Sequence, residues 1–194
     1  MFVFCAKNFK IYIGQMEKFK SAIFLISFLQ GIVFFFGCGN ESPQNYFNIA
    51  VLNTNMLSGF AGNGFIRQLD SPSSKLSEDG QTTSPVSRSE IIKMKIDNME
   101  ENLQKVEDLK VTDDTKDIIT SSKNLYNFVI PVLKNEYLKL AEMYDNGAPA
   151  DQINSYSQSI QDKYSSKYKE LYDTLIANGK AYAEKNNIKV NWGN

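Results

Sequence analysis

Residues 87–106 read SRSEIIKMKIDNMEENLQKV, and this stretch decides the fold class of the chain. Ser87 and Glu90 form a capping box, in which a hydroxyl and a carboxylate three residues apart satisfy free backbone N–H groups of a first helical turn. The apolar residues that follow recur at spacings of four and three: Ile92, Ile96, Met99, Leu103 and Val106. This spacing gives a helix one apolar face, so the stretch predicts an amphipathic helix that packs against other helices.

A second helical pattern follows a short break. Thr112 is a good N-cap residue, and apolar residues continue at helical spacing up to Asn146-Gly147, where a left-handed residue can end a helix. Pro131 lies inside this pattern. Because proline removes one backbone N–H and clashes with the preceding turn, it predicts a kink.

A third pattern completes the predicted fold. Pro149 suits the start of a helix that reaches about Asn186, with Gly179 as a candidate break. Three helices with short connections predict an all-α domain over residues 87–194, an antiparallel three- to four-helix bundle without a β-sheet. Residues 46–58 contain enough apolar side chains to form a short helix, and they are the candidate fourth member.

The segment before this domain has a different composition. Three glycines within six residues, followed by a stretch rich in Ser, Thr and Pro, predict a loop or flexible arm over residues 59–86. With the short helix at 46–58, residues 38–86 are therefore expected to form a tether that leads to the helical domain.

The first 37 residues carry the pattern of an export signal. Lys18 and Lys20 precede an almost entirely apolar run over residues 21–36, and Gly37 stands immediately before Cys38. A basic start, an apolar centre and a small residue before a cysteine resemble the signal peptide of bacterial lipoproteins, which is cut before its cysteine.

Two further features bear on this resemblance. Met16 suits the start of such a signal better than Met1, because residues 1–15 add nothing that a signal needs. Phe35 occupies the position where lipoproteins usually carry leucine. An uncleaved transmembrane helix is the alternative interpretation, since the apolar run approaches the ~20 residues that cross a bilayer.

The resemblance implies that Cys38 carries acyl chains that hold the protein in the membrane of the cell envelope, most simply the outer membrane. The part after the signal also resembles uncharacterised helical lipoproteins of Bacteroidetes-type bacteria. That likeness rests on Asp113-Asp114-Thr115-Lys116, Lys134-Asn135-Glu136-Tyr137 and Val190-Asn191-Trp192-Gly193. It implies no particular activity.

Composition excludes several classes of function. Removal of residues 1–37 takes four lysines and one glutamate from 21 basic and 22 acidic residues, which leaves a net charge of −4. Nucleic acid is therefore not an expected partner, because its binding needs a basic surface. The sequence has no histidine, Cys5 is lost with the signal and Cys38 is taken by lipid. Without histidine or a free cysteine, a Ser-His-Asp triad, a cysteine nucleophile and a Cys/His zinc site are excluded, and no cofactor is expected.

Asp113, Asp114 and Asp117 allow two interpretations. Hard cations take several oxygen ligands, so three nearby carboxylates could hold one. Acidic residues are also expected in a first helical turn, where the helix dipole favours them. Capping is the stronger interpretation, and no metal site is predicted.

Aromatic residues are the main candidates for binding. Tyr164, Tyr168 and Tyr172 recur every four residues on one side of the third helix, and Trp192 lies near the end of the chain. Aromatic rings with a polar group suit the recognition of sugars or proteins, although packing at the edge of a core is the alternative. We therefore expect a non-enzymatic binding or accessory role with an envelope protein partner, or alternatively a periplasmic module for a small ligand or cation.

Overall fold

The structure is a computed structural model that describes residues 41–71, 73–77 and 79–192. The chain divides into two units, Met1–Glu41 and Ser42–Asn194, and the architecture described is that of the second. The predicted signal peptide, the start at Met16 and the predicted sites at Gly37 and Cys38 lie outside the described residues.

Helices dominate the second unit, which confirms the mostly helical class. In chain order the elements are α2 (Pro43–Ala50), the 3-10 helix η2 (Leu52–Leu57), α3 (Asn63–Asp70), β1 (Ser73–Leu76), β2 (Thr83–Val86), α4 (Arg88–Glu107), α5 (Lys116–Val132), the π-helical turn η3 (Leu133–Tyr137), α6 (Leu138–Asp145) and α7 (Ala150–Lys185).

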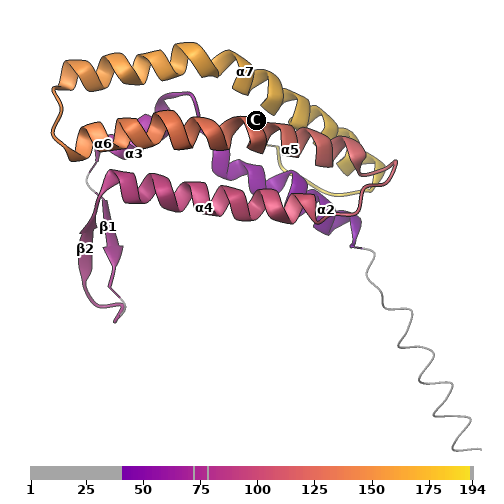
Figure 1. The fold of residues 1–194 in the computed structure, drawn as a ribbon. Coiled ribbons are helices and arrows are strands. Elements are labelled where there is room, and N and C mark those ends of the chain that lie inside the picture. Colours follow the sequence, from indigo (N-terminus) through magenta and orange to yellow (C-terminus); the bar gives the residue numbers. More distant parts are fainter. Residues whose placement is uncertain (1–40, 72, 78, 193–194) are drawn as a thin grey trace, which may run out of the picture. The chain divides into compact units, whose positions relative to one another are not determined.

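The long helices lie side by side, and the chain reverses direction between them (Figure 1). Helix α5 contacts both α4 and α7. Helix α4 begins where its sequence predicts, because the Ser87 hydroxyl accepts a hydrogen bond from the Glu90 N–H at 3.1 Å. The Glu90 carboxylate pairs with Lys75 at 2.8 Å instead, so only the Ser87 half of the predicted capping box is formed. Two carboxylate oxygens of Asp145, at the end of α6, accept the N–H groups of Arg88 and Ser89 at 2.8 and 2.9 Å. The end of one helix therefore fixes the start of another.

Residues 42–71 pack into the core, which corrects the expectation that this part of the chain is a tether. Phe47, Leu57 and Phe65 come from α2, η2 and α3, and each is at most 1% exposed. Burial of large apolar side chains is the main stabilising term in folding, so residues 42–71 belong to the folded domain. The apolar content of residues 46–58 indicated a helix correctly, but the helix begins earlier, at Pro43, and continues as η2.

Two glycines allow this segment to turn back on itself. A Cβ atom placed on Gly64 would lie 2.7 Å from the Gly59 Cα atom, and Gly59 has a φ of +83°. Ala61, which is buried in the same turn, also has a positive φ of 52°, and its N–H donates to the Tyr137 hydroxyl at 3.0 Å. The glycines predicted a loop, but their role is a close crossing of two backbone segments.

A small hairpin replaces the rest of the predicted loop and corrects the expectation of no β-structure. Strands β1 and β2 pair antiparallel, with Ser73 opposite Val86 and Leu76 opposite Thr83. The turn between them is closed by the Ser77 N–H, which donates to the Thr82 carbonyl at 2.8 Å. Figure 1 shows the hairpin projecting from one end of the helical layers.

Helix α5 starts later than its sequence predicts. The hydroxyls of Thr112 and Thr115 each accept the other residue's N–H, at 3.3 and 2.9 Å, and so close a turn before the helix. The helix itself begins at Lys116. Thr112 therefore caps a turn, and the acidic residues beside it lie mostly before the helix.

Pro131 does not end its helix, and a π-helical turn follows it. The Leu138 N–H donates to the Leu133 carbonyl, five residues back, across η3. Proline supplies no N–H to the helical ladder, and a π turn is one way in which a helix absorbs such a defect. The π turn lies at the position where the sequence predicted a kink. Glu136 is one of its residues.

Helix α7 is continuous from Ala150 to Lys185, so the candidate break at Gly179 is wrong. The connection before it follows the prediction, because Gly147 has a φ of +68° and ends α6. Pro149 is the N-cap of α7, one position before the helix. Among the described residues, no helix is both long and apolar enough to span a membrane.

Candidate functional site

The tyrosine row predicted on α7 exists, and all three side chains are half-buried. The rings of Tyr168 and Tyr172 stack with centroids 5.7 Å apart and planes inclined by 28°. The three hydroxyls nevertheless meet different surroundings, because each faces a different segment of the chain. The row therefore divides into one residue that binds a carboxylate, one that packs and one that opens into a pocket.

Tyr164 belongs to a cluster around Glu136. The hydroxyls of Tyr164 and Tyr156 donate to the two carboxylate oxygens of Glu136 at 2.6 and 2.5 Å, and the Lys163 ammonium lies 3.1 Å away. These hydrogen bonds and the lysine lower the pKa of Glu136 to about 2. The carboxylate is thus fully engaged, and the cluster joins the π turn to α7.

Replacement of Glu136 by glutamine is expected to change how stability depends on pH. The pKa of Glu136 is about 2 in the folded protein, against an ordinary value of 4.5. The stabilisation that the charged Glu136 adds to the free energy of unfolding is therefore present above about pH 4.5. As the pH falls toward 2, up to about 3 kcal/mol of this stabilisation is lost. Between pH 7 and pH 2, the wild type should lose that much more free energy of unfolding than Glu136→Gln, measured by denaturant titration.

A matched control is Glu170→Gln. Glu170 and Lys167 both lie on α7 and pair at 2.7 Å, but the Glu170 side chain is 63% exposed. Exposed ion pairs contribute little to the free energy of unfolding. The control should keep the pH dependence of the wild type. Identical pH profiles for Glu136→Gln and the wild type would show that the cluster does not hold the charged carboxylate.

Tyr168 packs against the edge of the core. Its hydroxyl donates to the Leu57 carbonyl at 2.9 Å, and its ring lies 5.0 Å from that of Phe60. Burial raises the pKa of Tyr168 well above its usual range. This residue therefore fixes η2 against α7, and it is not free to contact a ligand.

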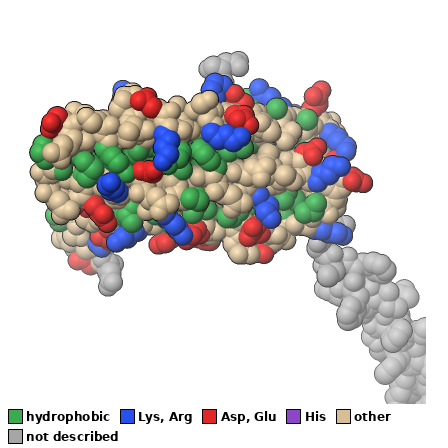
Figure 2. Space-filling model, turned by 45° about the horizontal axis from the view of Figure 1, so that its top comes forward, with side chains coloured by type: hydrophobic (Ala, Val, Ile, Leu, Met, Phe, Trp, Pro, Cys, Tyr) green, Lys and Arg blue, Asp and Glu red, His purple; other side chains and the backbone are tan. Residues whose placement is uncertain are grey.

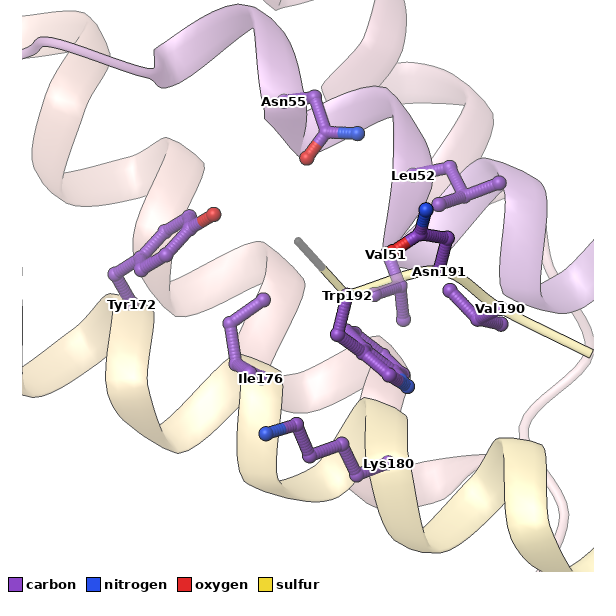
Figure 3. Close-up of a pocket in the computed structure, with 9 residues that line it drawn as sticks. All are labelled: Val51, Leu52, Asn55, Tyr172, Ile176, Lys180, Val190, Asn191 and Trp192. Carbon is purple, nitrogen blue, oxygen red and sulfur yellow. The ribbon is translucent and has the colours of Figure 1, made fainter. Parts of the chain in front are cut away.

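Tyr172 opens into a pocket of about 180 Å³. The pocket lies between η2, α7 and the C-terminal tail, and Figure 3 shows the Tyr172 hydroxyl and the Asn55 amide pointing into the space between these segments. Its lining consists of Val51, Leu52, Asn55, Tyr172, Ile176, Lys180, Val190, Asn191 and Trp192. The structure thus joins two of the predicted binding residues, Tyr172 and Trp192, in one site.

Trp192 forms one wall of this pocket. Its ring meets that of Phe47 edge-on, with centroids 5.8 Å apart, and the Lys180 ammonium lies 5.6 Å from the centroid of the indole. A Cβ atom on Gly179 would lie 2.9 Å from Val51 and 3.4 Å from Trp192. Gly179 therefore lets the tail and the junction between α2 and η2 approach α7 closely, and it does not act as the candidate break.

Sequence reasoning missed Lys180, Asn55 and Gly179 as members of the site. A signal for Lys180 was present, because Tyr172, Ile176 and Lys180 are spaced by four residues and share one face of α7. Asn55 had no such signal, since it reaches the pocket from a segment more than a hundred residues away.

The three aspartates do not form a metal site. Asp114 pairs with Lys185 at 2.5 Å and Asp113 with Lys116 at 3.6 Å, and the Lys185 contact lowers the pKa of Asp114. Within the described residues, no group of three or more His, Cys, Asp or Glu side chains is arranged to hold a metal ion.

Surface charge is mixed on the face shown in Figure 2. Lys and Arg side chains there alternate with Asp and Glu, and apolar side chains lie between them. Comparisons with protein-family models, with curated proteins and with solved structures give no match for this chain. Its function is therefore inferred from the predicted signal in the sequence and from the pocket.

Proposed function

We propose that this chain is a lipid-anchored protein of the bacterial cell envelope, in the outer membrane, that binds a ligand or an envelope partner without catalysing a reaction. The pocket that joins Tyr172 and Trp192 is the observation that carries the binding role. The run Gly37-Cys38 after a basic and apolar leader carries the anchoring role.

The anchor in this proposal is a set of acyl chains on Cys38. Two or more chains hold a protein stably at a membrane, whereas one holds it only marginally. The folded unit begins at Ser42, four positions after Cys38, so the link would be short and the helical domain would stay close to the bilayer.

The scaffold in this proposal is an antiparallel helical bundle. Helices α4, α5–α6 and α7 would form its three long members, with α2 and η2 as the shorter fourth. The contacts of α5 with both α4 and α7 support this arrangement, as do the reversals of chain direction in Figure 1. Such a bundle would provide a rigid support for the pocket on one side of α7.

A binding role without catalysis is supported by the chemistry of the available side chains. The sequence has no histidine to act as a general base near neutral pH. Glu136 has a pKa of about 2 and its oxygens are held by two tyrosines and a lysine, so it is a weak base. A small-ligand module is favoured over a cation module, because the pocket is lined by aromatic, amide and ammonium groups.

The anchoring is tested by growing cells that express the full chain with labelled palmitate. The wild type should carry the label and fractionate with membranes, whereas Cys38→Ala should lose the label. Cys5→Ala is the matched control, because Cys5 precedes the proposed cleavage site and should leave labelling unchanged. Label that persists in Cys38→Ala would rule out acylation at that residue.

A further inference from the structure

The pocket between η2, α7 and the tail has a distinctive charge pattern. Lys180 is the one charged residue among the nine described residues that line it, and none of the nine is acidic. We infer that the pocket binds a small organic carboxylate that carries hydroxyl groups, the class to which uronic acids belong. This inference rests on the binding role proposed above and names the class of ligand.

The positive charge of Lys180 has no carboxylate partner among the described residues. Its ammonium lies over the indole of Trp192, at 5.6 Å from the ring centroid. A nearby acid on the same helix, Asp173, pairs with Lys169 at 2.5 Å. An anionic group in the pocket would therefore meet an available cation and no repelling charge, and a charge-assisted hydrogen bond is among the stronger polar contacts.

Neutral polar groups around the lysine favour hydroxyls on the ligand. The Tyr172 hydroxyl and the Asn55 side-chain amide point into the pocket, and neither forms a hydrogen bond with another described residue. A hydroxyl both donates and accepts, and an amide does the same with separate atoms. These two groups can thus bind the hydroxyls of a ligand whose carboxylate contacts Lys180.

The apolar walls and the size of the pocket limit the ligand further. Val51, Ile176 and Trp192 provide surfaces against which the C–H groups of a sugar ring can pack. A volume of about 180 Å³ is below the ~300–1,000 Å³ of pockets for drug-sized ligands, so a single ring fits better than an oligomer. A zwitterionic amino acid is disfavoured, because its ammonium group would find no carboxylate in the lining.

The experiment uses Trp192 as the reporter, because it is the single tryptophan of the sequence. The full chain in detergent micelles is titrated with sodium D-glucuronate and, separately, with sodium D-galacturonate while tryptophan emission is recorded. D-Glucose serves as the neutral analogue, and sodium acetate at equal ionic strength measures non-specific salt effects. The variants are Lys180→Met, which keeps the apolar stem of the side chain, and Lys167→Met, a control on the exposed face of α7.

We expect a saturable change in emission with at least one of the two uronates, and none with glucose or acetate over the same range. Lys180→Met should weaken uronate binding tenfold or more, whereas Lys167→Met should bind like the wild type. Circular dichroism of each variant checks that the fold is kept.

Three results would overturn the inference: no saturable change with either uronate, equal affinity for glucose, or unchanged uronate affinity in Lys180→Met. A saturable response to glucose alone would reject the acid class but leave the pocket as a binding site. Palmitate labelling does not depend on the pocket, so a negative titration would leave the anchoring proposal standing.

Discussion

Replacement of Gly64 by alanine is expected to destabilise the protein by about 3 kcal/mol or more, a large share of the 5–15 kcal/mol that stabilises a typical domain. The added Cβ would lie 2.7 Å from the Gly59 Cα atom and 3.3 Å from the Gly59 carbonyl oxygen. Both are backbone atoms, so no side chain can rotate away. Overpacking usually costs about 1–3 kcal/mol, and the cost rises when backbone must move.

Movement of this backbone would also break hydrogen bonds. The Gly59 carbonyl accepts the N–H groups of Gly62 and Phe65, each at 3.3 Å. Phe65 is 1% exposed, so displacement of its helix would disturb the core. We expect a lower midpoint of guanidinium unfolding and an unchanged dependence of the unfolding free energy on guanidinium concentration. Unfolding is monitored by far-UV circular dichroism.

Gly62→Ala is the matched control in the same turn. A Cβ there would be 3.8 Å from the nearest atom, which is ordinary contact, and the φ of Gly62 is −125°. The control should therefore change the free energy of unfolding by less than about 1 kcal/mol. Equal midpoints for Gly64→Ala and Gly62→Ala would show that the close crossing is not present in solution.

The parts of the fold that the sequence predicted well are governed by local interactions. The sequence signal for the start of α4 is Ser87, whose hydroxyl accepts the N–H three residues on, and the signal for the end of α6 is the left-handed Gly147. Such signals are complete within one turn of helix, although Asp145 adds a distant contact at the start of α4. The start of α5 was harder to place, because Thr112 and Thr115 exchange hydrogen bonds in a turn that a sequence pattern does not distinguish from a cap.

The parts that the sequence missed depend on distant contacts. Gly59 and Gly64 resemble loop residues in any local window, and only their mutual approach explains them. The hairpin was missed because its strands have four residues each and one contains Pro85, which is depleted in strands. A short polar pattern of this kind carries little signal above that of a loop.

The candidate site shows the same division. The four-residue spacing of the tyrosines placed them correctly on one side of α7, but it could not distinguish their roles. Tyr164 meets Glu136, Tyr168 meets Leu57 and Tyr172 meets the pocket, because three different segments pack along the helix. The sequence left open whether the helix continues through Gly179 or breaks there, and only the close approach of Val51 and Trp192 explains this glycine.

The second large effect is expected for Phe47→Ala, which should lower the free energy of unfolding by about 3–5 kcal/mol. Phe47 is fully buried, and its ring meets Trp192 edge-on at 5.8 Å. Truncation would therefore leave a cavity between α2 and the tail and would also remove an aromatic contact. We expect a lower unfolding midpoint and, in the native state, a red-shifted emission from Trp192 as its ring becomes more exposed to water.

Leu52→Ala tests whether position in this segment or burial decides the effect. Leu52 lies five residues further along, at the start of η2, and is 37% exposed. Because it is already partly in contact with water, its truncation should cost about 1 kcal/mol or less. If Phe47→Ala were as mild as Leu52→Ala, residues 42–71 would be a dispensable tether. A large difference between the two variants would instead mean that α2 is part of the cooperative core, and that the wall of the pocket formed by Trp192 depends on it.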